Sequence, residues 1–175
     1  MMRQALRRAM ACFLLAAVLS TAAVIPASAA GFRDVPSGHW AAESIERCVC
    51  LGFFQGKSAS QFGMGEEMTR SAFAVVLCRF FGWETPVPDQ ATFQDVPVNA
   101  WYAGAVEAAY DHGAVTDQRK DFRPNDPITR EELAVMLVRA LGYGTIAGLV
   151  QELPTPFQDV TSSAGYITMA HDMGL

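Results

Sequence analysis

Cationic residues are scarce in this chain, which has 13 lysines and arginines against 18 aspartates and glutamates and a net charge of −5 at pH 7. The N-terminal stretch 1–30 holds three of the arginines and no acidic residue, so the rest of the chain is more acidic still. Nucleic-acid binding draws much of its affinity from the neutralisation of phosphates by basic side chains. The charge balance therefore argues against a nucleic-acid partner.

Long apolar runs are missing after residue 30, where none approaches the roughly 20 residues that span a bilayer. Residues 1–29 differ, because a basic start precedes an apolar run over 9–19 and a small-residue stretch that ends at Ala29. This order is typical of a secretory signal peptide, and we expect cleavage after Ala29. An uncleaved membrane anchor is the alternative. The mature chain is expected to be secreted and not transmembrane.

Cysteines and histidines form no catalytic or metal-binding pattern. We expect the three cysteines after residue 30 to be small core-filling thiols, with a disulfide to Cys78 or between chains as the alternative. The three histidines lack the spacing of a catalytic triad or a metal centre, and no glycine-rich phosphate loop occurs. The sequence thus predicts a protein that is not an enzyme and that has no cofactor and no metal site.

A long-period repeat runs through the chain after residue 30. Its opening motif, Phe-x-Asp-Val, begins at Phe32, Phe93 and Phe157. A pair of short helices cannot bury its own apolar faces, so neighbouring units must pack on each other. The predicted units are repeat 1 (30–84), repeat 2 (85–145) and a truncated repeat 3 (146–175).

Each complete unit is predicted to be helix, loop, helix. The first helix is expected over 40–51 in repeat 1, and over 99–112 in repeat 2 with Asn99 as its N-cap. Each is followed by a glycine that suits a left-handed helix end. The Pro-, Gly- and polar-rich stretches 85–92 and 142–156 are predicted linkers.

The second helices carry clearer start signals. Thr69 and Thr129 are predicted N-caps, because a threonine hydroxyl accepts a hydrogen bond from an otherwise unpaired backbone N–H. Glu132, three residues after Thr129, would complete a capping box. Apolar residues then recur at helical spacing over 73–82 and 133–142.

These motifs, in this order, resemble the S-layer homology (SLH) domain. Its usual pattern is F-x-D-V, a Trp, a first helix ending in Gly, an F-x-P-x-x-P turn and I-T-R-x-E. Repeat 2 matches almost throughout, whereas repeat 1 lacks the prolines of the turn and has Ala72 where repeat 2 has Glu132. The resemblance implies an all-α fold of repeated helix-loop-helix SLH units in a pseudo-threefold spindle, with the third unit incomplete.

The resemblance also implies a function, which is non-covalent anchoring to the bacterial cell envelope. Domains of this kind are similar in binding acidic, often pyruvylated, secondary cell-wall polysaccharide in grooves between units, and some relatives use peptidoglycan. The implied location is the cell surface or cell wall, and other surface-layer proteins are further candidate partners. The alternative is a helical protein–protein assembly module of the cell surface.

Two arginines are the first candidate contacts to an acidic glycan. Arg70 and Arg130 lie at the first turn of a predicted second helix, where free N–H groups and the helix dipole favour an anion. A guanidinium can also grip a carboxylate with two parallel hydrogen bonds. The alternative role is a structural salt bridge to an aspartate of the next unit.

Aromatic and acidic residues complete the candidate site. The tryptophans offer flat faces to sugar rings or serve as core, and the aspartates accept sugar hydroxyls or serve as turn and cap residues. The predicted polysaccharide-binding residues are Arg70, Arg130, Trp40, Trp101, Asp34, Asp95, Asp159, Thr69 and Thr129.

The third unit breaks off before any Thr-Arg cap or second helix. Two second helices would leave an apolar face open. We expect a premature end to a longer reading frame, with a partner that fills the gap as the alternative.

Overall fold

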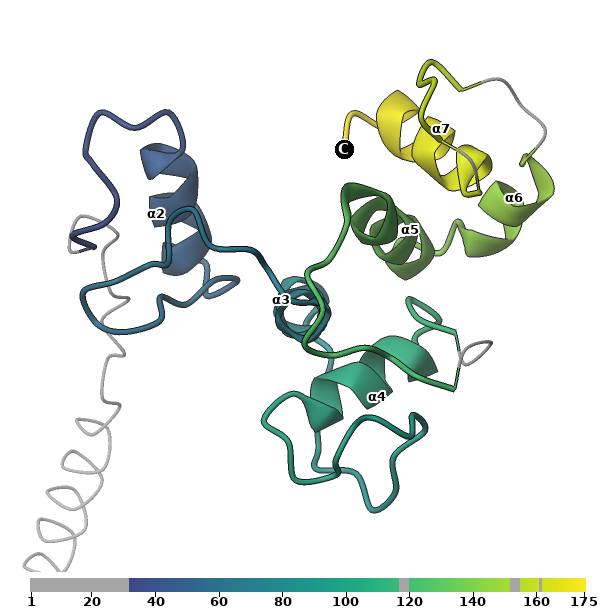
Figure 1. The fold of residues 1–175 in the computed structure, drawn as a ribbon, viewed down its shortest axis with the longest axis horizontal. Coiled ribbons are helices and arrows are strands. Elements are labelled where there is room, and N and C mark those ends of the chain that lie inside the picture. Colours follow the sequence, from purple (N-terminus) through teal and green to yellow (C-terminus); the bar gives the residue numbers. More distant parts are fainter. Residues whose placement is uncertain (1–31, 117–119, 152–154, 161) are drawn as a thin grey trace, which may run out of the picture.

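The computed structural model describes residues 32–116, 120–151, 155–160 and 162–175, so the predicted signal peptide lies outside the described residues. Their regular structure is helical, apart from two isolated β-bridges (Figure 1). This confirms the all-α prediction. The helices are α2 (Ala42–Cys50), α3 (Arg70–Phe81), α4 (Ala103–Asp111), α5 (Arg130–Ala140), α6 (Gly144–Leu149) and α7 (Ala164–Asp172).

The second helices of the repeats, α3 and α5, begin at the predicted caps. The Thr69 hydroxyl accepts a hydrogen bond from the Ala72 N–H at 3.2 Å. The Thr129 hydroxyl accepts one from the Glu132 N–H at 3.1 Å, and the Glu132 carboxylate accepts the Thr129 N–H at 3.0 Å. Both N-caps and the capping box are confirmed, because they depend only on residues within one turn.

The first helices begin later than predicted. α4 starts at Ala103 after an N-cap, Tyr102, whose side chain makes no capping hydrogen bond. The expected start at Asn99 is wrong, because two tight turns come first, closed by Ala100 N–H to Pro97 O at 2.9 Å and Ala103 N–H to Ala100 O at 3.0 Å. These turns place Trp101 ahead of the helix.

A short helix also replaces part of the predicted linker over 142–156. α6 follows Gly142, which is left-handed with φ 86° and ends α5. Ala147 of α6 is fully buried against Val138 of α5 and Ala170 of α7. Burial of Ala147 stabilises the helical conformation of this segment despite its glycines, because tertiary packing can override low helix propensity.

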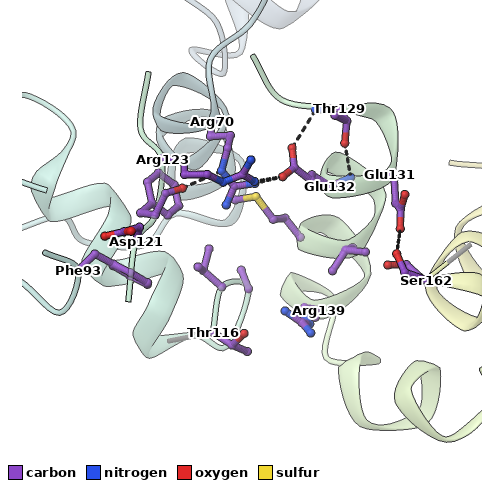
Figure 2. A pocket seen from close by; sticks show the side chains of 16 residues that line it. Arg70, Phe93, Thr116, Asp121, Arg123, Thr129, Glu131, Glu132, Arg139 and Ser162 are labelled. Atoms are coloured by element: carbon purple, nitrogen blue, oxygen red, sulfur yellow. Dashed lines mark hydrogen bonds and ion pairs between the residues drawn. The ribbon is translucent and has the colours of Figure 1, made fainter. Parts of the chain in front are cut away.

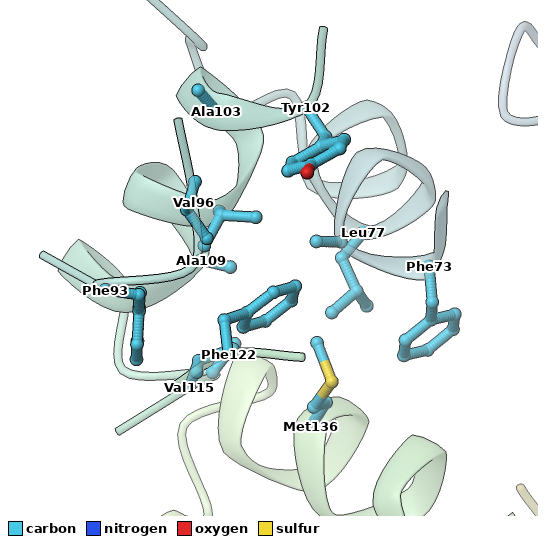
Figure 3. Packing of buried hydrophobic residues seen from close by; sticks show 13 residues of the cluster. Phe73, Leu77, Phe93, Val96, Tyr102, Ala103, Ala109, Val115, Phe122 and Met136 are labelled. Atoms are coloured by element: carbon cyan, nitrogen blue, oxygen red, sulfur yellow. The ribbon is translucent and has the colours of Figure 1, made fainter. Parts of the chain in front are cut away.

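Packing crosses the boundaries between repeats. α3 packs mainly on α4, the first helix of the following repeat, and α5 packs on α6 and α7, while α3 and α5 also touch. The largest core cluster joins Phe73 and Leu77 of α3, Val106 and Ala109 of α4, and Met136 of α5 (Figure 3). The prediction that neighbouring units share a core is confirmed. The pseudo-threefold arrangement is not confirmed, since the described residues contain two second helices.

Helix α2 and the chain segments packed around it, called the α2 group here, lie apart from this core (Figure 1). It has its own small cluster of Phe32, Ile45 and Val49. The ring of Phe53, just after α2, contacts the ring of Phe80 in α3, with centroids 5.0 Å apart.

Candidate functional site

The joint between repeats 1 and 2 is made by the two chain segments that precede α3 and α5. They run antiparallel, with Ile128 N–H donating to Met68 O at 2.8 Å and Arg70 N–H donating to Asp126 O at 3.0 Å. This pairing brings the first turn of α3 against the loop and cap of repeat 2. It therefore places Arg70 beside Glu132, which belongs to the next repeat in the sequence.

Arg70 is held inside this joint, with only 9% of its surface exposed. Its Nη1 lies 3.0 Å from Glu132 Oε1, its Nε donates to Phe122 O at 2.8 Å, and its guanidinium carbon lies 5.0 Å from the Phe122 ring centroid. Burial lowers the pKa of Arg70, and the negative charge of Glu132 opposes that shift. The alternative that the sequence left open, a salt bridge to the next unit, is the observed arrangement, with a glutamate as the partner instead of an aspartate.

Glu132 is shared by two guanidinium groups, those of Arg70 and Arg123. Desolvation raises the pKa of Glu132, but the hydrogen bond from the Thr129 N–H and the two positive charges outweigh it, so this pKa lies below its usual range. The carboxylate therefore stays ionised at neutral pH and links the two repeats.

Arg123 is a site residue that the sequence analysis missed. Its backbone is left-handed, with φ 60°, which is uncommon and strained for a residue with a side chain. The residue after the corresponding phenylalanine of repeat 1 is Gly63, with φ 99°. A bulky residue where the other repeat has glycine was the signal available in the sequence.

The predicted aspartates differ in their surroundings. Asp34 accepts hydrogen bonds from the N–H groups of Phe62 (2.8 Å), Gly63 (2.7 Å) and Met64 (3.0 Å), and these bonds lower its pKa from 3.8 to about 2. Asp95 likewise accepts the N–H groups of Phe122 (2.8 Å) and Arg123 (2.6 Å). Both carboxylates tie down the loop before a second helix. Asp159 is exposed.

A first groove, of about 510 Å³, lies between repeat 2 and the start of repeat 3 (Figure 2). Its cations are Arg70, Arg123 and Arg139, and its hydroxyls include Thr129 and Ser162. The remaining lining residues are Phe93, Ala114, Val115, Thr116, Asp121, Phe122, Glu131, Glu132, Val135, Met136 and Ser163. Of the predicted contacts, the first groove therefore brings together Arg70 and Thr129.

A second groove, of about 390 Å³, lies between α3 and α4 and contains Trp101. Its other lining residues are Val75, Cys78, Arg79, Gly82, Trp83, Thr85, Gly104 and Ala105. Trp101 is 71% exposed and Trp40 is 87% exposed, so both indoles lie on the surface and not in the core. Trp40, the exposed Arg130, Thr69 and the predicted aspartates line neither groove.

The thiols behave differently from one another. Cys78 is buried, its Sγ lies 3.4 Å from Ala105 O as a hydrogen-bond donor, and burial raises its pKa to about 11. Cys50 is exposed, so the core-filling prediction is wrong for that residue. Cys48, Cys50 and Cys78 are all unpaired in the described part of the chain.

The described ranges contain no group of three or more His, Cys, Asp or Glu side chains placed to hold a metal ion. No helix among them is both long enough and apolar enough to cross a membrane.

The S-layer homology domain model matches this chain twice, at residues 31–74 and 92–134. The chain belongs to the S-layer homology family. Its two matched domains include the starts of α3 and α5, and so contain both sides of the Arg70–Glu132 joint. Membership of this family, together with S-layer relatives, indicates attachment to the cell surface as the general role of such domains.

Curated relatives of this S-layer homology protein include surface-layer proteins and enzymes. The chain is 34% identical to S-layer protein EA1 of Bacillus anthracis over 81% of its length, and 33% identical to the S-layer protein of Bacillus licheniformis over 85%. It is also 33% identical to an amylopullulanase of Thermoanaerobacterium thermosulfurigenes over 62%. The matched regions cover 16%, 17% and 6% of these relatives, so the chain spans less than a fifth of each.

Proposed function

We propose that this chain anchors a protein to the bacterial cell envelope by binding an acidic secondary cell-wall polysaccharide in the first groove. The polymer is a secondary polysaccharide or another peptidoglycan-linked polymer, and pyruvyl groups are candidate sources of its charge. The protein reaches the surface by secretion, directed by the predicted signal peptide 1–29. S-layer relatives and family membership support the general role.

The observation that carries the proposal is the concentration of guanidinium groups in one groove of an acidic chain. The whole chain has a net charge of −5 and would repel an acidic polymer, so attraction must be local. Three arginines line the first groove together with the carboxylates of Asp121, Glu131 and Glu132. Arg123 has the most exposed side chain of the Arg70–Glu132–Arg123 cluster. Hydroxyl groups beside them can exchange hydrogen bonds with sugar hydroxyls.

The predicted contacts take different roles in this proposal. Thr129 lines the groove and offers its hydroxyl as a contact. Arg70 supports the groove wall through its ion pair with Glu132 and its hydrogen bond to the Phe122 carbonyl. Trp101 offers its exposed indole to a sugar in the second groove. Arg130, Trp40 and Asp159 remain accessible for contacts outside the two grooves.

Retention on purified cell walls tests this function. The full chain is mixed with protein-free wall sacculi, before and after mild acid extraction of the secondary polymer, and bound protein is measured after sedimentation. We expect binding to intact walls, loss after extraction, and weaker binding as salt rises. Equal retention on extracted walls would contradict a secondary polymer as the ligand. No retention on either would contradict anchoring by this groove.

Exposed apolar side chains favour a second candidate, assembly with another protein of the surface layer. Residues 141–175 expose several large apolar side chains, which is typical of a protein contact when they are contiguous. These are Leu141, Tyr143, Ile146, Leu149, Phe157, Met173 and Leu175. Sedimentation velocity tests whether the chain self-associates. Retention on walls that lack the secondary polymer but keep their surface proteins tests whether it binds another protein, and either result would favour the assembly module.

A further inference from the structure

A second pair of arginines occupies equivalent positions in the two repeats. The helix segments 73–82 and 133–142 align without a gap, and this alignment matches Arg79 of α3 with Arg139 of α5. Both lie in the last turn of their helix. They are therefore distinct from the Thr-Arg arginines at the starts of the same helices.

Each of these arginines lines one of the two grooves. Arg79 faces the second groove together with Trp101 and Gly104, which lie at the start of α4. Arg139 faces the first groove together with Ser162 and Ser163, which lie just before α7. In Figure 2, Arg139 lies well away from the Arg70–Arg123–Glu132 cluster. In each groove, the last turn of a second helix therefore lies opposite the start of the next repeat's first helix.

A glycine in each of α4 and α7 also allows close approach of the preceding segment, and Gly104 of α4 lines the second groove. A Cβ on Gly104 of α4 would collide with the carbonyl oxygen of Pro86, and it would lie 2.6 Å from that of Thr85. A Cβ on Gly165 of α7, at the equivalent position of the next repeat, would collide with the carbonyl oxygen of Ala147. The repeat therefore reproduces this glycine contact as well as the arginine, although Gly165 and Ala147 do not line the first groove.

Neither arginine has a carboxylate partner among the described residues, in contrast to Arg70 and Arg123. Arg79 Nη2 donates to Gln55 Oε1 at 3.1 Å. Arg139 Nε donates to the Tyr166 hydroxyl at 3.3 Å, and its guanidinium carbon lies 5.0 Å from the Tyr166 ring centroid. These neutral contacts fix the side chains without neutralising them. Arg139 keeps both terminal nitrogens without an ion pair in this part of the chain.

The charged residues around Arg79 and Arg139 differ between the two grooves. The first turns of α4 and α7 contain no acidic residue. In the first groove, Glu132 is taken up by Arg70 and Arg123, and Glu131 accepts a hydrogen bond from Ser162 at 2.7 Å. Among the described residues, Arg79 is the only charged one that lines the second groove. In the first groove, three arginines are matched by Asp121, Glu131 and Glu132, and Arg139 is the arginine there that has no ion pair within the described ranges.

We propose that Arg79 and Arg139 form two carboxylate-binding sites, called seats here, one in each groove, and that each binds an acidic sugar of the same polysaccharide chain. This proposal rests on the function proposed above. A planar guanidinium matches a carboxylate with two parallel hydrogen bonds, so the seats favour carboxylated sugars over neutral ones. Two seats on one polymer also raise the apparent affinity through effective concentration.

The first experiment compares Arg79→Gln, Arg139→Gln and Arg47→Gln in the full chain. Arg47 is an exposed arginine of α2 that lines neither groove, so its variant removes the same charge elsewhere. The probe is polysaccharide released from purified walls, either native or with its carboxyl groups chemically reduced. We expect Kd for the native polymer to rise about tenfold for each groove variant, as for loss of a charge-assisted hydrogen bond, and to stay near the wild-type value for Arg47→Gln.

Two outcomes of that experiment overturn the proposal. A groove variant that binds native polymer as tightly as Arg47→Gln overturns the seat at that residue. Equal weakening for native and reduced polymer shows that the arginine acts through the fold and not through a carboxylate. Thermal unfolding followed by circular dichroism identifies any variant that has lost its fold, and Arg→Lys variants then repeat the comparison with the charge kept.

A second measurement separates failure of the seats from failure of the proposed function. Trigalacturonate, a small acidic oligosaccharide, is titrated into the labelled protein while the arginine Nε–Hε signals are followed by NMR. Shifts of the Arg79 and Arg139 signals, with the Arg47 signal unchanged, support the seats even if the chain is not retained on walls. Wall retention without these shifts supports anchoring and overturns the seats.

Discussion

The two Thr-Arg arginines show how one sequence position takes two different environments. Arg70 is buried against Glu132 and the Phe122 carbonyl of the next repeat, whereas Arg130 is exposed. The difference follows from the neighbouring repeat and not from the arginine itself, because each arginine follows a threonine whose hydroxyl accepts a hydrogen bond from the N–H three residues later. The side chain of Arg70 serves mainly to join repeats.

Replacement of Arg70 by methionine should therefore lower the free energy of unfolding by about 2–3 kcal/mol, since charge-assisted hydrogen bonds to a partly buried carboxylate and a buried carbonyl are lost. Arg130→Met, at the matching exposed position, should change it by less than about 0.5 kcal/mol. Urea unfolding followed by circular dichroism measures both values. Similar losses for the two variants would contradict the structural role assigned to Arg70.

Asp34 predicts a pH dependence of stability. Its pKa is lowered from 3.8 to about 2 by backbone hydrogen bonds in the folded chain, so the folded state favours the ionised carboxylate. This stabilisation is complete above about pH 4 and is lost as the pH falls through the folded pKa near 2. The wild type should therefore exceed Asp34→Asn in free energy of unfolding at pH 6, and the gap should narrow towards pH 2. A gap that stays constant over this range would contradict the assignment.

At the residue scale, sequence reasoning succeeded where the interaction is local. The caps at Thr69 and Thr129 were predictable because donor and acceptor lie three residues apart. The partner of Arg70 was not, because Glu132 comes from another repeat and could be reached only through the antiparallel pairing of two loops. The sites of Arg79 and Arg139 were missed because they appear only when second and first helices of successive repeats are placed together.

At the scale of elements, glycines in α4 and α7 set how closely the preceding segments approach, which are the 85–86 linker at Gly104 and α6 at Gly165. Alanine at position 104 would gain about 1 kcal/mol of helix propensity, but its Cβ would collide with the backbone of the 85–86 linker. Because the obstruction is backbone, the clash should exceed the gain.

We expect Gly104→Ala to lower the free energy of unfolding by about 1–3 kcal/mol. The matched control is Gly38→Ala, where a Cβ meets nothing within 4 Å and the change should stay within about 0.5 kcal/mol. Denaturant unfolding of the two variants gives the comparison. An unchanged midpoint for Gly104→Ala would mean that the linker moves aside at little cost.

Element boundaries followed the sequence less closely than element existence. The start of α4 shifted from Asn99 to Ala103 because the turns around Pro97 and Ala100 form first. α6 was not predicted because its two glycines argue against a helix, and only the burial of Ala147 between α5 and α7 compensates for them. Both differences come from tertiary contacts that no local pattern contains.

At the scale of the whole molecule, the α2 group should open separately from the rest. Its cluster contains three buried apolar residues, Phe32, Ile45 and Val49, while α3 and α4 share the large central core. Regions with few buried contacts open with lower free energy than the global value. Native-state hydrogen exchange should show α2 amides exchanging with a lower opening free energy than those of α3 and α4. Equal protection in all three helices would indicate a single cooperative unit.

The packing of α3 on α4, and of α5 on α7, means that the physical building block is out of phase with the written repeat. A cut near residue 84 or 145, where one motif ends and the next begins, separates helices that depend on each other for burial. A chimera that exchanges a block from one Phe-x-Asp-Val motif to the next would contain a second helix without the following first helix on which it packs. Segments for transplantation should instead keep each second helix together with the first helix that follows it, as α3 with α4.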